Sequence, residues 1–135
     1  AARRLSEGRR LVEDAGGRAI DGCVAPAWLY GPGARAALRD AGFRIAEDHS
    51  SVWSPLDGRV LLRSPVISWA SRTPTRLACS LLWSRFATLA FRRLRVVRVG
   101  LHPHDADLEV LVREIDRVIG AFSRDRRPLL LHDLL

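Results

Sequence analysis

The residues best suited to chemistry lie in Leu101–Asp105, which reads Leu-His-Pro-His-Asp. The mostly β-branched run Val96–Gly100 before it predicts a short buried strand that ends at the glycine. Loops that leave the carboxyl ends of parallel strands usually carry the active sites of α/β proteins. A histidine there can act as general acid or base near neutral pH. On spacing alone, the simpler interpretation is favoured: His102 ends a strand, and His104 starts the next helix.

Other titratable residues are candidates for binding a metal ion. His102 and His104 flank a proline and could share a metal, but a complete site needs one or two further ligands that the spacing does not identify. His49 follows the carboxylates of residues 47–48 at another predicted strand end, where it could approach His102. A solvated loop is the simpler interpretation of that cluster. We therefore regard His104, Asp105 and His49 only as weak candidates for metal ligands.

Four aromatic residues fall at or near the ends of predicted strands. Side chains of this kind could line a groove the size of a sugar, or could pack in the core or at its rim, and we weigh the two interpretations equally. The residues are Trp28, Tyr30, Trp53 and Trp69.

Helices and strands alternate along the chain in the βα order that is typical of a parallel sheet or barrel. The apolar periodicity predicts helices over residues 2–15, about 32–41, 74–91 and 107–122. It predicts strands over residues 19–25, 43–46 and 95–101, with brief extended segments at 60–62 and 66–69. Residues 50–65 are otherwise irregular, and residues 128–133 form an apolar segment of uncertain type. We expect the third helix to bury Leu77, Ala78, Leu81, Leu82, Phe86 and Leu89.

The net charge of +7 is carried by arginine alone, because the sequence contains no lysine. The arginines run from Arg3 to Arg127 and are interleaved with acids, except around Arg92–Arg95. A nucleic-acid binder usually clusters its positive charge, so binding to nucleic acid or to an acidic surface is a minor alternative. The two cysteines lie in apolar surroundings and far apart in the sequence, and we expect buried free thiols.

A chain of 135 residues is one domain in length, and we expect a single domain over residues 1–135. It begins Ala-Ala-Arg-Arg and contains no methionine, so we expect it to be part of a longer protein. Residues 1–16 show no secretory signal, which slightly favours the cytoplasm but leaves the compartment open. The most apolar stretch, residues 77–94, contains three arginines and two serines, so we expect no membrane span.

Four blocks taken in order resemble the C-terminal part of a polysaccharide deacetylase-like protein, in a bacterial branch of the NodB-homology superfamily. They are Val24–Leu29, a helix that ends Gly42–Arg44, Ser64–Trp69, and Leu101–Asp105 with the amphipathic helix after it. The similarity extends over nearly the whole chain and keeps the order and spacing of the blocks.

The resemblance implies an α/β fold, namely the C-terminal portion of a distorted (β/α)7 barrel with parallel strands and outer helices. It also implies a metal-dependent hydrolase that removes acetyl groups from N-acetylated carbohydrate, commonly with zinc. By position in the family pattern, His102 is the general acid and the backbone N–H of Trp28 contacts the oxyanion. Pro26, Trp28, Tyr30 and Trp69 would line the substrate groove.

The sequence departs from the family pattern at three places. Ala25 stands where the family has an arginine, and the customary aspartate of the block at Trp69 is missing. The aspartate pair and the His-x-x-x-His metal site would precede Ala1, so the divalent metal belongs to the complete protein and is not assignable within this chain. We therefore expect this chain alone to be inactive.

The alternative is a non-catalytic remnant or a carbohydrate-binding module with the same fold. In either case the expected partner is an N-acetylated carbohydrate and not a nucleic acid. Half of a barrel would leave open sheet edges, which favour self-association.

Overall fold

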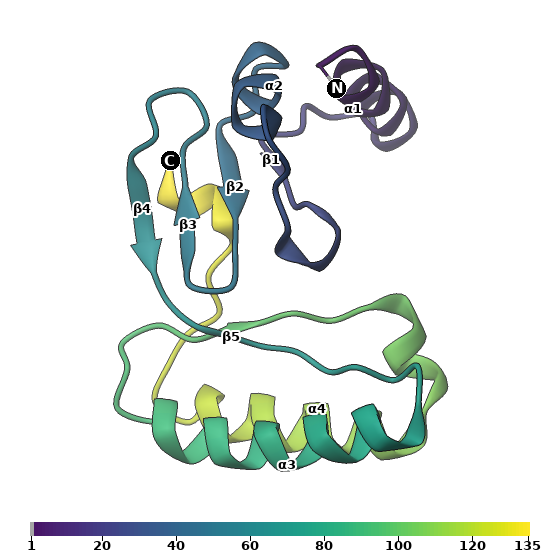
Figure 1. Ribbon diagram of the computed structural model, residues 1–135. Helices are drawn as coiled ribbons and strands as arrows, with labels where there is room; N and C mark the ends of the chain where they lie inside the picture. The colour runs from purple at the N-terminus through teal and green to yellow at the C-terminus, as the bar shows by residue number, and fades with distance from the viewer. Residues whose placement is uncertain (1) are drawn as a thin grey trace. The chain divides into compact units, whose positions relative to one another are not determined.

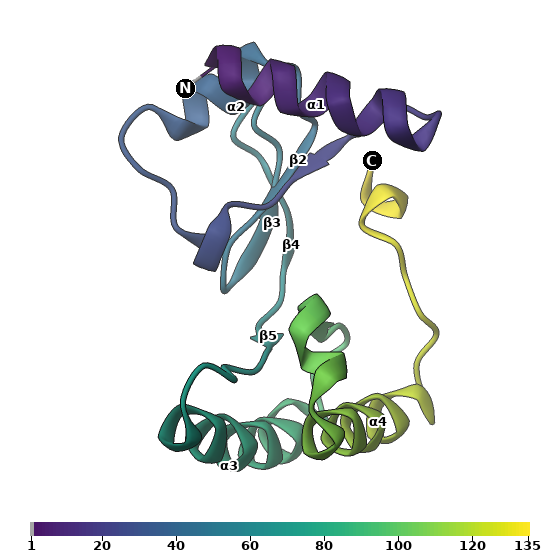
Figure 2. The ribbon, with the colours of Figure 1, turned by 90° about the vertical axis from the view of Figure 1, so that its right-hand side faces the viewer.

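A computed structural model describes residues 2–135, and the chain forms two compact units (Figures 1 and 2). Unit 1 comprises the chain up to Arg63 together with Leu129–Leu135, and unit 2 comprises Ser64–Pro128. Each unit combines helices with a small sheet, so the mixed α/β class predicted from the sequence is confirmed. The described residues form no closed barrel.

Unit 1 contains a four-stranded sheet in the order β1-β2-β3-β4. β1 and β2 are parallel, with Gly22 opposite Ile45, whereas β2-β3 and β3-β4 are antiparallel. The elements are α1 (Ala2–Gly16), β1 (Gly22–Cys23), the 3-10 turn η1 (Pro26–Trp28), α2 (Ala34–Asp40), β2 (Ile45–Glu47), β3 (Ser51–Trp53), β4 (Val60–Arg63) and η3 (Leu131–Leu134).

The antiparallel part of this sheet differs from the all-parallel arrangement predicted above. Asp48 explains the difference, because its Oδ1 accepts hydrogen bonds from the backbone N–H groups of Ser50 and Ser51, 2.9 Å each. This Asx-type turn reverses the chain within three residues, and a connection that short can join only antiparallel strands. The stretch predicted to be irregular therefore contains β3, while β4 coincides with the extended segment predicted at residues 60–62.

Two long-range contacts hold the ends of unit 1. The guanidinium of Arg9, on α1, donates to the carbonyl oxygens of Ala41 and Gly42 at the end of α2, at 2.9 and 3.0 Å. These carbonyls lack partners within their helix, so the arginine satisfies them. At the other end of the chain, Nδ1 of His132 lies 2.7 Å from Oδ2 of Asp21 and fastens η3 beside β1.

Unit 2 consists of a parallel strand pair and two long helices. β5 (Val66–Ile67) pairs with β6 (Arg98–Val99), and α3 (Pro74–Phe91) connects them. The 3-10 turn η2 (Pro103–Asp107) and α4 (Glu109–Ser123) follow, and α3 and α4 lie side by side in both views (Figures 1 and 2). The core of unit 2 consists of Ile67, Trp69, Ala87, Leu111, Val118 and Phe122.

The helix α3 has the predicted bounds, but its buried face differs from the predicted one. Leu82, Phe86 and Leu89 are exposed to 69%, 61% and 67%, and Ala78 is exposed too, so the prediction that these side chains are buried is wrong. Cys79 is also exposed, contrary to expectation, while Cys23 is half-buried. The buried residues of α3 are Ser80, Ser84, Ala87 and Thr88.

A buried polar network explains which face of α3 turns inward. The hydroxyl of Ser84 donates to Oε1 of Glu114 on α4, and Arg117 donates to both oxygens of the same carboxylate at 2.7 and 2.8 Å. The hydroxyl of Thr88 donates to the Ser84 carbonyl. A buried carboxylate needs such partners, and the only α3 side chain with a hydrogen bond to Glu114 among the described residues is that of Ser84. The apolar residues opposite are therefore turned outward.

No helix within residues 2–135 has the length and apolar character needed to cross a bilayer.

The network predicts a pH-dependent stability. The Arg117 guanidinium holds the pKa of Glu114 below its ordinary value of 4.5. The charged carboxylate therefore stabilises the fold above that value, and its contribution is lost as the pH falls through the lowered pKa. We expect Glu114→Gln to lower the free energy of unfolding by about 1–2 kcal/mol at pH 7, since Arg117 is partly exposed. Urea denaturation at pH 7 and at about pH 3 measures this difference, which should shrink at the lower pH.

Glu109→Gln is the matched control, because Glu109 pairs with Arg113 on the exposed side of the same helix. It should change the free energy of unfolding by at most about 0.5 kcal/mol. Equal stability of Glu114→Gln and the parent at pH 7 would show that the network does not hold α3 to α4.

Candidate functional site

The first candidate site lies in unit 1, at the shared carboxyl edge of the parallel strands β1 and β2. Nε1 of Trp28, which follows β1, donates to Oε1 of Glu47 at 3.1 Å, and its ring lies 4.9 Å from the ring of His49. The Tyr30 hydroxyl donates to the carbonyl of Glu47 at 2.6 Å. We call these four residues, Trp28, Tyr30, Glu47 and His49, the aromatic cluster. Two segments that were predicted separately thus form one site.

The backbone at this site is strained. Ala27 has φ 54° and Trp28 has φ 57°, so two consecutive non-glycine residues are left-handed. Such a conformation costs about 1–2 kcal/mol per residue in L-amino acids. Backbone strain of this kind concentrates at functional sites, where the surrounding structure holds it in place. Here the contacts of Trp28 with Glu47 and His49 hold it.

Within the strained turn, the backbone N–H of Trp28, to which the family resemblance assigns the oxyanion contact, already has a hydrogen-bond partner. The backbone N–H of Trp28 donates to the carbonyl oxygen of Ala25 at 2.9 Å. To contact an oxyanion, this N–H has to exchange that bond for one to the substrate. Its assignment as an oxyanion donor stays a prediction, as does the groove role of the exposed Pro26.

The titratable groups around the cluster have distinct charge states. Burial raises the pKa of Tyr30, so its phenol stays neutral and serves as a donor. Burial alone would raise the pKa of Asp48, but hydrogen bonds from Ser50 and Ser51 outweigh it and lower that pKa. The carboxylate of Asp48 is therefore taken up by the turn, and the cluster itself combines one carboxylate side chain, that of Glu47, with an aromatic surface. Such a combination suits a sugar, whose ring stacks on indole and whose hydroxyls donate to carboxylates.

The second candidate site lies in unit 2, after the parallel strands β5 and β6. Trp69 follows β5 by two residues, and His102 follows β6 by three. The side chain of His102 is 56% exposed, while that of Asp105 is 3% exposed. The backbone N–H of His102 donates to Oδ2 of Asp105 at 2.9 Å, and that oxygen lies 3.7 Å from Nδ1 of the imidazole. The buried carboxylate of Asp105 therefore fixes the backbone of the exposed His102 and faces its ring.

Asp105 has a role that sequence reasoning missed. It was considered as a weak metal ligand, whereas its carboxylate is used to hold the start of η2. The signal was present in the spacing, because an acidic residue three positions after the residue that starts a helical turn is the pattern of a capping box.

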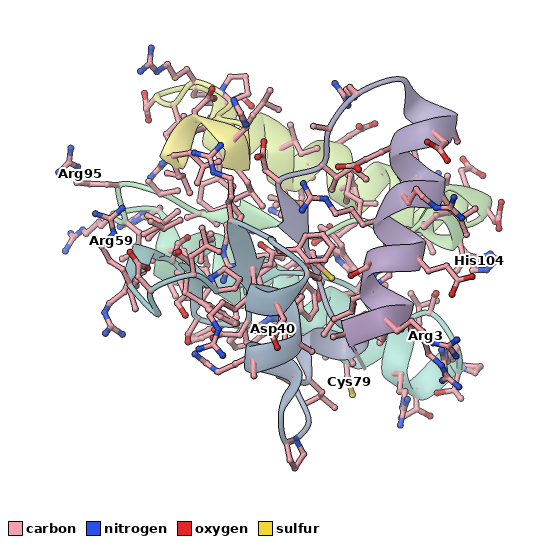
Figure 3. All side chains as sticks on the ribbon, turned by 90° about the horizontal axis from the view of Figure 1, so that it is seen from above. Arg3, Asp40, Arg59, Cys79, Arg95 and His104 are labelled. Atoms are coloured by element: carbon pink, nitrogen blue, oxygen red, sulfur yellow. The ribbon has the colours of Figure 1, made fainter. Side chains whose placement is uncertain are left out.

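His104 does not join His102. Its side chain is 90% exposed, extends from the periphery of the chain (Figure 3) and lies 3.3 Å from the carboxylate of Asp107. Within residues 2–135, no three histidine, cysteine or acidic side chains are grouped closely enough to hold a metal ion. His49 packs on Trp28 within unit 1, and its approach to His102 stays a prediction.

Two tryptophans proposed as groove residues are buried. Trp69 is 4% exposed within the core of unit 2, and Trp53 is 2% exposed in that of unit 1. For Trp53 this favours the core alternative, with Arg35 stacked 4.1 Å from the centre of its ring. The indole N–H of Trp69 has no hydrogen-bond partner among the described residues, so it can still donate to a ligand. Its groove role stays a prediction.

The strained turn predicts that glycine stabilises position 27. We expect Ala27→Gly to raise the free energy of unfolding by about 0.5–1 kcal/mol, because glycine adopts a left-handed conformation without a steric penalty. Ala36→Gly, at an exposed position within α2, is the matched control and should lower it by about as much. Chemical denaturation measures both, and a loss of stability in both variants would contradict a left-handed Ala27.

Neither family models, nor curated protein sequences, nor solved structures yield a match to this chain.

Proposed function

We propose that this chain is the C-terminal part of a polysaccharide deacetylase-like hydrolase, which removes acetyl groups from N-acetylated carbohydrate. The proposal rests chiefly on one observation: His102 and Trp28 each follow the carboxyl end of a strand in a parallel pair. These are the positions that the resemblance assigns to the general acid and to the oxyanion contact. Strand ends of this kind carry the catalytic groups in βα folds.

The finer fold assignment belongs to the same proposal. β1-α2-β2 and β5-α3-β6 are both parallel strand pairs joined through a helix. Such βαβ units are the repeating element of (β/α) barrels. Two of them in one chain support the C-terminal portion of a distorted (β/α)7 barrel, with β3 and β4 as an inserted antiparallel excursion.

The reaction requires more than this chain contains. Hydrolysis of an amide needs a metal ion to polarise the carbonyl and activate water, a base for the proton of that water, and an acid for the departing nitrogen. In our proposal a divalent metal, commonly zinc in the family, is held by residues that precede this chain. His102 supplies the acid: its side chain is 56% exposed, and the carboxylate of Asp105 lies 3.7 Å from Nδ1, which orients the imidazole that donates a proton to the departing amine.

A carbohydrate-binding module is the second candidate function. The contact between Trp28 and His49, with Glu47 on the indole N–H, favours it, because this cluster can bind a sugar without a metal. The hydrolase requires His102 for turnover, whereas the carbohydrate-binding module catalyses no reaction.

The test compares two neighbouring histidines in the whole gene product that includes this chain. We expect His102→Ala to lower kcat on an N-acetylated oligosaccharide by about 10²–10⁴-fold with little change in KM, the range typical of a lost general acid. His104→Ala, whose side chain is exposed, should change kcat less than twofold. Equal rates in the parent and His102→Ala would contradict the deacetylase assignment.

The isolated chain should bind but not turn over. With added zinc and a chromogenic N-acetyl sugar, we expect no release of acetate above background. N-acetylated oligosaccharides should still shift the tryptophan fluorescence of the parent but not that of Trp28→Ala. Turnover by the chain alone that disappears in His102→Ala would overturn the prediction that catalysis needs further residues.

A further inference from the structure

The outward face of α3 is apolar along much of its length. Leu82, Phe86 and Leu89 are exposed to more than 60%, and Trp83 is exposed to 46%. The rings of Trp83 and Phe86 lie 5.8 Å apart, so the aromatic residues form one surface. Together these four side chains expose on the order of 500 Å², which is near the upper end for the largest apolar patch of a monomer. We call them the α3 patch.

Arginines flank the α3 patch on both sides. At about 100° per residue, Arg85 and Arg92 lie along one edge of the apolar stripe and Arg76 lies along the other, with Arg93 near the C-terminal end. All four are exposed. Helix α3 contains no acidic residue, and no carboxylate in residues 2–135 is within ion-pair distance of these arginines, although Arg85 attracts the carboxylate of Glu114 on α4 from farther away.

The positive charge is concentrated in the unit that carries the patch. Unit 2 has 12 arginines and 6 acidic residues, a net charge of +6, which leaves +1 of the total +7 for unit 1. Between Asp57 and Asp105 the chain has nine arginines and no acid. The run without acids is therefore much wider than the Arg92–Arg95 neighbourhood singled out above.

We propose that the α3 patch and its flanking arginines bind the surface of a bilayer that contains anionic lipid. A helix that lies in the membrane interface places leucine and aromatic side chains among the acyl chains and directs its cationic side chains to the headgroups. Arginine beside an apolar stripe suits a helix in the membrane interface, because its aliphatic stem packs on apolar surface while its guanidinium reaches the lipid phosphates. The opposite face of α3 stays packed on α4, so the helix need not leave the fold.

The same observations disfavour two other occupants. In a second copy of the chain, two α3 patches in contact would bring their flanking arginines together with no acid on α3 to compensate. The patch is also smaller than the roughly 800 Å² per partner of a stable dimer. A nucleic acid would engage the arginines but leave Leu82 and Leu89 in water, because backbone phosphates and stacked bases offer no apolar layer for them.

The experiment measures binding of the 135-residue chain to 100 nm vesicles by co-sedimentation. We expect it to bind vesicles of phosphatidylcholine with about 30% phosphatidylserine, and to bind pure phosphatidylcholine at least tenfold more weakly, since each arginine near the surface contributes favourably. Replacing Leu82 and Phe86 together with glutamine should weaken binding to the anionic vesicles at least tenfold. Replacing Arg85 and Arg92 together with glutamine should weaken it about tenfold or more.

The controls change the same residue types elsewhere. Leu130→Gln removes an equally exposed leucine outside α3, and Arg4→Gln with Arg10→Gln removes two exposed arginines from α1. Both should bind within twofold of the parent. Trp83 gives an independent signal, since Trp53 and Trp69 are buried and Trp28 is half-buried in unit 1: anionic vesicles should shift the emission to the blue, and Trp83→Phe but not Trp28→Phe should remove that shift. Circular dichroism spectra and midpoints of urea denaturation that match those of the parent show that the variants are folded.

Three results would overturn the proposal. One is the absence of binding to anionic vesicles, or binding that the leucine and phenylalanine replacements leave unchanged. Another is a dimer in analytical ultracentrifugation that these replacements dissociate, which assigns the patch to a second copy. The last is binding to an oligonucleotide that is tighter than binding to vesicles and depends only on the arginines.

Discussion

The buried carboxylate of Glu114 determines how unit 2 is assembled. A charged group inside a protein must be surrounded by donors, and here Ser84 and Arg117 supply them. Because Ser84 belongs to α3, this requirement fixes the rotation of a helix whose most apolar stripe lies on the opposite side. The hydrophobic effect alone would bury Leu82 and Phe86 at least as readily as the serine and threonine face. The need of the Glu114 carboxylate for hydrogen-bond donors therefore determines which face of α3 is buried.

The fixed rotation of α3 separates two surfaces of unit 2. The inward face packs on α4 and helps to cover the core beneath β5 and β6, after whose carboxyl ends Trp69 and His102 follow. The outward face displays the leucines and aromatic residues of the α3 patch between arginines. The proposed lipid contact and the proposed proton donor therefore depend on different parts of unit 2, and one can be altered without the other.

The two candidate sites illustrate two ways of holding a functional side chain. At His102, a buried carboxylate three residues later accepts the backbone N–H and faces the ring, so little strain is needed. At Trp28, the backbone is left-handed and tertiary contacts with Glu47 and His49 maintain it. The second arrangement is the costlier one, and it is the one that depends on residues distant in the sequence.

The sequence by itself determined the elements, because apolar period, proline and glycine act locally. It predicted the bounds of α3, the amphipathic α4 and the position of His102 after a strand. Tertiary structure decided the rest: the antiparallel β3 and β4, which depend on the Asp48 turn, the outward face of α3, and the meeting of Trp28 with Glu47. The Asp48 turn is local, since its partners are Ser50 and Ser51. The outward face of α3 and the meeting of Trp28 with Glu47 could not be predicted from spacing, because each depends on which distant partner a polar group finds once the chain is folded.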